Sequence, residues 1–144
     1  MNAEQIFSIC NSAALLGWLI LVFAGRARWA SPLVSGAVLP LLLALAYLGL
    51  LLGHWGETKG GFSTLAGVAA LFTNHWLLLA GWIHYLAFDL FIGSWEVRDA
   101  KAHGISHSIV IPCLFFTFMF GPVGLLLYFG VRTVRVRGLT LMAN

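Results

Sequence analysis

The most chemically capable part of the chain is the run from Gly81 to His107, GWIHYLAFDLFIGSWEVRDAKAHGISH. It holds three of the five histidines and three of the five acidic residues, although the rest of the chain is mostly apolar. Carboxyl, imidazole and guanidinium groups in one place can supply a proton donor, a proton acceptor and a stabiliser of negative charge. The candidate catalytic residues are His84, Asp89, Glu96, Arg98 and Asp99.

Helical spacing divides these residues between two faces. Trp82, Asp89 and Glu96 are seven residues apart, so they lie on one face if the helix continues past Gly93. His84 points about 140° away from Asp89. An ionisable side chain in an apolar span costs several kcal/mol unless it faces the protein interior, water or a partner, so Asp89 is the most informative residue.

A purely structural role for these charges stays open. Asp89 could pair with Arg98 or contact a histidine and so fix helix packing, as intramembrane charges sometimes do. The segment Trp95 to Asp99, WEVRD, also has the mixture of Trp and charges that is typical of a membrane interface.

A metal site is the weaker hypothesis for the same region. His103 and His107 have the spacing of two ligands on a helix, but Gly104 between them and Ser106 as a candidate N-cap predict that they lie on either side of a turn. No compact HExxH or CxxC motif is present. We therefore expect no cofactor and keep the two histidines only as candidate metal ligands.

The composition predicts an integral membrane protein. The chain is 60% hydrophobic and 9% charged, with a mean hydropathy of +0.93, whereas soluble domains have roughly 25% charged residues. The net charge of +3 suits lipid headgroups better than nucleic acid. With 144 residues the chain has room for one domain, residues 1–144, with a few spans of about 20 residues each.

We expect an all-α membrane protein with four transmembrane helices. The segment FSTLAGVAALF is too short to cross and predicts an interfacial or re-entrant helix between spans two and three, with Ser63 or Thr64 as its N-cap. Pro40 is expected to kink the second span. The four predicted spans cover residues 6–24, 33–52, 76–93 and 106–131.

Four spans place both termini on one side of the membrane, but the basic residues do not indicate which side. One face would carry Arg26, Arg28, Arg98 and Lys101, and the other Lys59, Arg132, Arg135 and Arg137. The positive-inside rule therefore gives a tie.

Four segments together resemble one known family. They are FSTLAGVAALF, LLAGWIHYLAFDLFIGSWEVRDA, GISH and IPCLFFTFMFGPVGLLLY, and the likeness extends over essentially the whole chain. The sequence resembles the abscisic-acid-deficient-four-like membrane family. This resemblance implies four helices, a membrane location and a connection with carotenoids, because in plants the family is implicated in forming neoxanthin from violaxanthin.

The implied reaction, epoxycarotenoid to allenic alcohol, is an isomerisation that needs an acid at the epoxide oxygen and a base at a neighbouring carbon. We expect Asp89, with Glu96 or Asp99, and His84 to divide these roles, and Arg98 to hold an acid ionised or stabilise the developing alkoxide. The residues expected to contact a rod-shaped apolar substrate are Trp82, Phe88, Trp95, Phe120 and Gly121.

Two other functions remain as alternatives. The chain could be a non-enzymatic pigment-binding or assembly subunit of a photosynthetic membrane complex, or a small proton or ion pathway. Because no plant-type transit sequence is present, we expect a bacterial member in the inner membrane. Its expected partners are a carotenoid or other apolar lipid, membrane lipids, and further copies of itself or a larger membrane complex.

Overall fold

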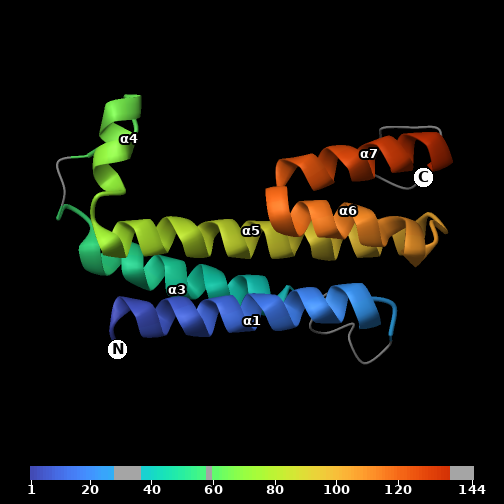
Figure 1. Ribbon diagram of the computed structural model, residues 1–144, viewed down its shortest axis with the longest axis horizontal. Helices are drawn as coiled ribbons and strands as arrows, with labels where there is room; N and C mark the ends of the chain where they lie inside the picture. The colour runs from blue at the N-terminus through green and yellow to red at the C-terminus, as the bar shows by residue number, and fades with distance from the viewer. Residues whose placement is uncertain (28–36, 58–59, 137–144) are drawn as a thin grey trace.

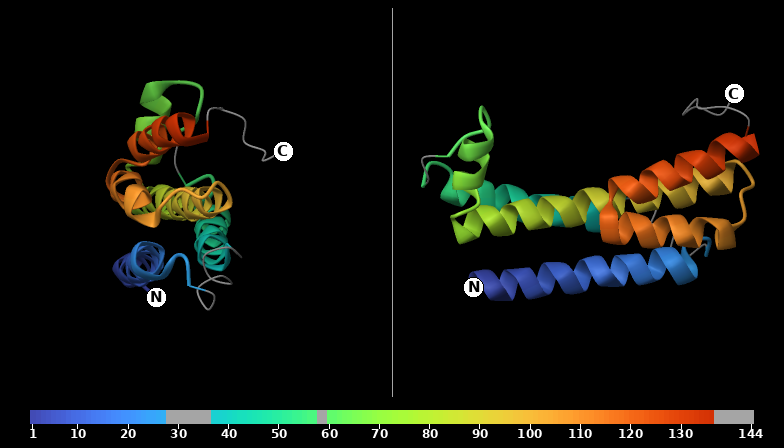
Figure 2. Two further views of the ribbon diagram at one scale, coloured as in Figure 1. Left: turned by 90° about the vertical axis from the view of Figure 1, so that its right-hand side faces the viewer. Right: turned by 45° about the horizontal axis from the view of Figure 1, so that its top comes forward.

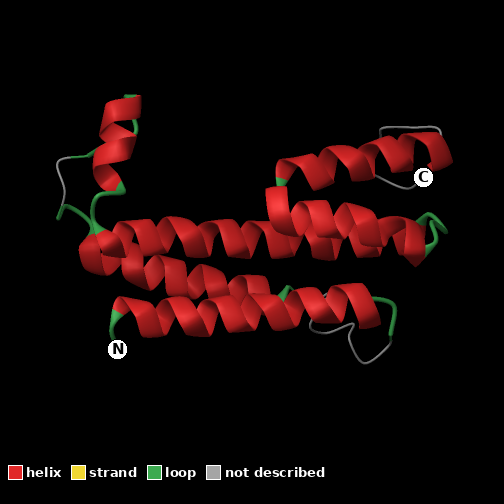
Figure 3. Ribbon diagram, viewed as in Figure 1, coloured by secondary structure: helices red, strands yellow, loops and turns green. Residues whose placement is uncertain are grey.

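The computed structural model describes residues 1–27, 37–57 and 60–136, and these residues form six helices and no strands (Figure 3). The expected all-helical class is confirmed. The helices are α1 (Ala3–Ala24), α3 (Val38–His54), α4 (Leu65–Leu71), α5 (His75–Ala102), α6 (His107–Phe120) and α7 (Pro122–Val136).

Helix α5 is the centre of the molecule (Figure 1). Helices α1, α3, α6 and α7 all contact it, and the two views of Figure 2 place them around it. Among the described residues only α1 and α5 are both long and apolar enough to cross a membrane. The structure therefore does not confirm four spans.

Side-chain caps explain where three of the helices begin. Asn2 accepts from the Gln5 amide and the Gln5 side chain accepts from the Asn2 amide, which is a capping box at the start of α1. Thr64 caps α4, so the short helix expected there is present, with the second of its two predicted N-caps. Asn74 accepts from the Trp76 and Leu77 amides at the start of α5.

The second predicted span begins later than expected. Its first residues fall within 28–36, outside the described residues, and α3 begins at Val38 after Ala37, whose φ of 52° is left-handed. Pro40 therefore lies in the first turn of α3, where the missing amide proton costs no helical hydrogen bond. The predicted kink in the middle of this span was wrong for that reason.

The predicted fourth span is two helices. Helix α6 ends at Gly121, whose φ of 41° and ψ of −93° reverse the chain, and α7 begins at Pro122 and runs back beside α6 (Figure 1). Proline suits the first position of a helix, which has no amide partner to lose. By contrast, the third predicted span continues nine residues beyond residue 93, to Ala102.

Contacts with the loop between α3 and α4 hold one end of the bundle. The His54 imidazole lies 2.9 Å from Glu57 Oε1, and Asn74 donates to Glu57 Oε2 at 3.0 Å. These two hydrogen bonds lower the pKa of the Glu57 carboxyl, and the one from His54 has the larger effect. Through Glu57, these contacts link the end of α3 to the start of α5.

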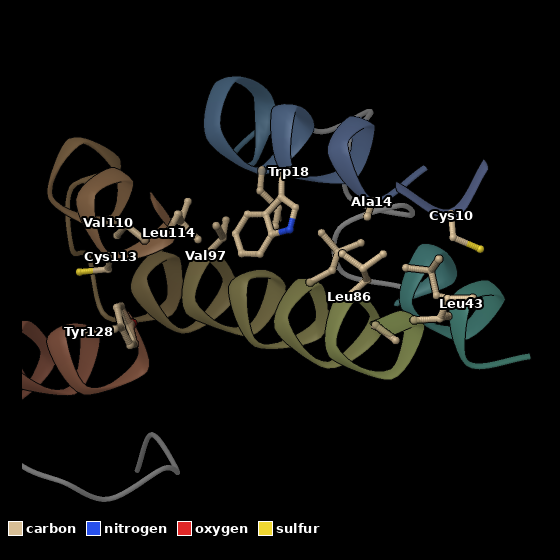
Figure 4. Packing of buried hydrophobic residues seen from close by; sticks show 14 of the residues in the cluster. Cys10, Ala14, Trp18, Leu43, Leu86, Val97, Val110, Cys113, Leu114 and Tyr128 are labelled. Carbon is tan, nitrogen blue, oxygen red and sulfur yellow. The ribbon is translucent and has the colours of Figure 1, made fainter. Parts of the chain in front are cut away.

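Small residues let α1 pack closely on α5. Gly93 faces the buried Trp18 ring, and a Cβ at Gly93 would lie 2.7 Å from Cη2 of that ring. Figure 4 shows Trp18 lying between α1 and α5, with Leu86 and Val97 on α5 to either side of it. The core is therefore a seam of apolar side chains along α5.

Replacing Gly93 with Ala should destabilise the fold by about 1–3 kcal/mol, because the buried Trp18 ring and Leu21 would have to shift from their packed positions to admit the added methyl group. Gly49→Ala is the matched control. A Cβ at Gly49 in α3 would meet nothing within 4 Å, so this change should be neutral or stabilise by up to about 1 kcal/mol. Thermal unfolding of the purified proteins compares them; equal midpoints would contradict this account of the α1–α5 seam.

Candidate functional site

A polar stripe runs along the face of α5 that meets α6 and α7. Its members are four, seven, three and four residues apart, which keeps them on one side of the helix. Each of them lies against a residue of α6, α7 or the turn between them. The polar stripe consists of Tyr85, Asp89, Glu96, Asp99 and His103.

An ion pair anchors α7 to this stripe. Arg132 Nε donates to Asp99 Oδ2 at 2.7 Å, and the Tyr128 hydroxyl donates to the same oxygen at 2.6 Å. Arg132 is 1% exposed and Tyr128 is 0% exposed. Because these charges are withdrawn from solvent, each depends on the other being in place.

His103 completes this cluster at the end of α5. Its Nδ1 donates to the Asp99 carbonyl oxygen at 2.8 Å, and Arg132 donates to its Nε2 at 3.2 Å. One ring nitrogen donates and the other accepts, which fits the neutral imidazole. All the hydrogen-bonding positions of His103 are thus used for structure.

Glu96 is buried deeper in the same interface. It is 0% exposed, and Thr117 donates to its Oε1 at 2.9 Å. Thr117 in turn packs directly against Gly124, so α6 and α7 approach too closely there for any side chain larger than hydrogen. Glu96 Oε2 is buried and has no hydrogen-bond partner among the described residues.

Asp89 differs from the other acids because it borders a cavity. Its Oδ2 is buried without a hydrogen-bond partner among the described residues, while its Oδ1 lies against Gly121, where an added Cβ would be 2.8 Å away. The Asp89 cavity has a volume of about 340 Å³ and lies between α1, α5 and α6. It is lined by Asn11, Ala14, Leu15, Trp18, Trp82, Tyr85, Leu86, Asp89, Phe118 and Met119.

The walls of the Asp89 cavity are mainly apolar and include four aromatic rings, with a few polar groups at defined positions. Trp82 Nε1 donates to Asn11 Oδ1 at 2.9 Å across the gap between α5 and α1. Tyr85 donates to the Phe118 carbonyl at 3.2 Å, near the end of α6. Apolar walls with a few convergent polar groups are typical of small-molecule sites. The arrangement can hold an apolar molecule against one carboxyl group.

Comparison with known proteins gives one match. A family model described as ABA4-like, or ABA DEFICIENT 4-like, matches residues 5–128. The chain belongs to the ABA4-like family. The resemblance recognised in the sequence is therefore confirmed, and the family indicates a function related to carotenoids and abscisic acid. No curated protein and no solved structure matches the chain.

In this ABA4-like protein the predicted catalytic residues do not all meet. Asp89, Glu96 and Asp99 lie on the polar stripe, and Asp89 also lines the Asp89 cavity, whereas His84 lines a different cavity of about 260 Å³ between α3, α4 and α5. His84 lies on another face of α5, between the rings of Tyr47 and Phe88. Arg98 is nine residues from Asp89, hence on the opposite side of α5, and its guanidinium lies 5.9 Å from the Phe91 ring centroid.

The predicted substrate contacts are also divided between regions. Trp82 lines the Asp89 cavity and Gly121 touches Asp89 itself. Phe88 stacks on His84, and Trp95 packs against Tyr128 at 5.3 Å between ring centroids. Phe120 at the end of α6 is exposed. Only the first two therefore share a place with the candidate acid.

The two candidate metal ligands face different partners. They lie on either side of a turn, as predicted, since His103 ends α5 and His107 begins α6. His107 Nε2 lies 2.8 Å from the Val22 carbonyl, one of the last four of α1, which have no partner within that helix. Within the described ranges no three His, Cys, Asp or Glu side chains are arranged to hold a metal ion.

Sequence reasoning missed several residues of this site. Arg132 enters the sequence analysis only as one of the basic residues at a membrane face. Tyr128 lies four residues earlier, which places an aromatic hydroxyl and a guanidinium on one helical face, and this spacing is the available signal. Tyr85 was also overlooked, four residues before Asp89. The one signal at Asn11 is that it is a polar residue within an apolar span, where a hydrogen-bond partner is expected; in the structure that partner is Trp82.

Breaking the Asp99 ion pair should destabilise the protein strongly. Asp99→Ala removes the carboxylate from a buried guanidinium, so we expect a loss of about 3–5 kcal/mol in unfolding free energy. The double variant Asp99→Leu/Arg132→Met should recover most of this loss, because no buried charge remains. Arg135→Gln, an exposed change on the same helix, should stay within about 0.5 kcal/mol.

Denaturant or thermal unfolding in detergent measures all three variants. A single variant as stable as the unmodified protein would show that the pair does not hold α7 in place. A double variant no more stable than Asp99→Ala would show that shape rather than charge is the cause.

Proposed function

We propose that this ABA4-like protein is an integral membrane protein that binds a carotenoid and isomerises an epoxycarotenoid at Asp89. The observation that carries the proposal is the Asp89 side chain, which lines a mainly apolar cavity and has one buried oxygen without a hydrogen-bond partner among the described residues. The family match supports the carotenoid, and the distribution of polar and apolar side chains supports the membrane.

The surface and the interior support a lipid environment. Large apolar side chains are exposed along the outer faces of α1, α3, α6 and α7, whereas Glu96 and Arg132 are fully buried. Burying charges while exposing Leu and Phe is unfavourable in water. Removing a charge from water costs free energy, and apolar surface is stabilised when it leaves water. In a bilayer the same distribution is favourable.

Helix lengths suggest three crossings and one re-entrant hairpin. Helices α1, α3 and α5 are about 33, 26 and 42 Å long, whereas α6 and α7 are about 21 and 22 Å. Helix α3 has 17 residues, about the lower limit for a transmembrane helix, whereas α6 with 14 and α7 with 15 residues fall below that limit. A turn at membrane depth must be buried in protein, and Gly121 is buried against Asp89.

This hairpin would remove the tie in the positive-inside count. All the described Lys and Arg residues lie at the end of the molecule where α1, α5 and α7 finish (Figure 1). They are Arg26, Arg98, Lys101, Arg132 and Arg135. By the positive-inside rule that end faces the cytoplasm, with the N-terminus and α4 on the opposite side.

Cysteine labelling tests this topology. With the buried Cys10 and Cys113 replaced by Ala, single cysteines at Glu57 and Arg135 should react with a membrane-impermeant maleimide from opposite sides of the membrane. Four complete spans would instead place both on one side. Lys101→Cys is the control, because it should label from the same side as Arg135 only if α6 and α7 form a hairpin.

The proposed chemistry exchanges one proton for another. The Asp89 carboxylic acid donates its proton to the epoxide oxygen while the C–O bond next to the polyene breaks, and that bond's electron pair stays on oxygen. The second Asp89 oxygen accepts the proton of the adjacent vinylic carbon, and the C–H electron pair forms the new double bond of the allene. Substrate and product are isomers, so no electrons are gained or lost.

A single carboxyl group suits this site better than a separated acid and base. Asp89 is neutral before and after such an exchange, so no net charge has to be stabilised among Trp82, Trp18 and Phe118. Tyr85, which lines the same cavity, is placed to hold the oxygen-bearing ring against Asp89.

Asp89→Asn should abolish isomerisation while leaving pigment binding intact. Loss of a positioned general acid and base lowers the rate by about 10²–10⁴-fold. The assay incubates the purified protein in lipid with violaxanthin and follows product by chromatography and mass. Glu57→Gln is the matched control, because it also turns a carboxylate into an amide but lies outside the cavity.

Other outcomes separate the alternatives. Isomerisation at the full rate in Asp89→Asn would remove Asp89 from the reaction. Stoichiometric bound pigment without turnover, in both the unmodified protein and the variant, would favour a non-enzymatic pigment-binding subunit. Proton flux in pigment-free vesicles that disappears in Asp89→Asn would favour an ion pathway.

A further inference from the structure

A second cavity lies between the beginnings of α1 and α5. Its volume is about 300 Å³, and this His75 cavity has both apolar and polar walls. Leu78, Leu79 and Phe7 supply apolar surface, whereas Glu4 and His75 are exposed polar residues at its outer end. It is lined by Ala3, Glu4, Phe7, His75, Leu78, Leu79 and Trp82.

Trp82 connects this cavity to the one at Asp89, because its side chain lines both. Its ring lies 6.1 Å from that of Phe7 in the His75 cavity, and its indole nitrogen donates to Asn11 in the Asp89 cavity. The two cavities therefore follow one another along the same α1–α5 seam and share Trp82 as a lining residue.

The polar groups lie at the two ends of this seam. Fourteen residues of α5 separate His75 from Asp89, which is about 21 Å along the helix axis. Between them the walls are mainly Leu, Ala, Phe, Trp and Met. The two polar side chains there are already engaged, Asn11 by Trp82 and the Tyr85 hydroxyl by the Phe118 carbonyl. A seam of this form suits a rod-shaped apolar molecule with an oxygen-bearing group at each end.

We infer that Glu4 and His75 form a second anchoring subsite, which binds the hydroxylated end group of the polyene whose other end lies at Asp89. This inference rests on the proposed function, since it takes the carotenoid of the Asp89 cavity as its ligand. The Glu4 carboxylate can accept a hydrogen bond from a hydroxyl group, and the His75 imidazole can donate or accept one.

The two subsites have different tasks because they lie at different depths. Glu4 and His75 are exposed at the end of the bundle, where a hydroxyl group can keep water as well as protein partners. Asp89 lies deep along α5, under the α6–α7 turn. Fixing the outer end therefore sets how far the other ring reaches along the seam, and so positions it against the carboxyl group.

Binding of polyenes that cannot react tests the inference. Pigment-free protein in detergent is titrated with zeaxanthin, which has a hydroxyl group at each end, and with β-carotene, which has none; polyene absorbance reports binding. The Glu4→Ala/His75→Phe variant should bind zeaxanthin about two- to tenfold more weakly, the effect of losing one hydrogen bond, and should bind β-carotene as before. Glu57→Gln, at the same end but outside both cavities, should change neither affinity.

Each result decides a separate point. Equal losses for both polyenes, or no loss for either, would overturn the second subsite. If the unmodified protein isomerises violaxanthin while the variant binds zeaxanthin normally, only the subsite is wrong. If the hydroxyl effect is present but no epoxycarotenoid reacts, the subsite stands and the isomerase proposal fails.

Discussion

The buried ion pair between Asp99 and Arg132 is the interaction on which the arrangement of the other helices depends. It holds α7 against α5, and α7 in turn holds α6 through the close approach of Gly124 to Thr117. Without this hairpin the polar stripe of α5 would be uncovered, and in the proposed bilayer environment unpaired carboxylates cost several kcal/mol each. Packing of the α6–α7 hairpin on α5 therefore both covers the polar stripe and forms the candidate site.

The same constraint makes Asp89 different from the acids around it. Asp99 has an ionic partner and Glu96 has a hydroxyl donor, but Asp89 lies where α6 ends, against a glycine and the edge of a cavity. Three carboxyl groups on one helix face thus acquire three environments from what covers them. A reactive carboxyl group must be accessible to its substrate, and of these three carboxyl groups Asp89, at the end of the hairpin, lines a described cavity.

Periodicity in the sequence predicted the parts of this structure that depend on one helix at a time. The seven-residue spacing of Trp82, Asp89 and Glu96 placed them on one face because α5 is continuous past Gly93. The reversal at Gly121 was not predicted, since hydropathy over residues 106–131 is the same for one crossing helix and for two short ones. The partner of Asp99 was likewise hidden, because pairing Arg132 with α5 requires the chain to turn back first.

In the proposed topology, that reversal also removes the tie that the positive-inside count gave from the sequence alone. If residues 106–131 formed one crossing helix, the residues after it would lie on the opposite side of the membrane from the end of α5. A hairpin places them on the same side as the end of α5. The turn therefore decides on which side Arg132 and Arg135 enter the positive-inside count. Gly121 permits the turn through its positive φ, and Pro122 starts the next helix at no cost in hydrogen bonds. Gly121 thus both reverses the chain and lies against Asp89, so the proposed orientation in the membrane and the geometry of the candidate site depend on the same turn.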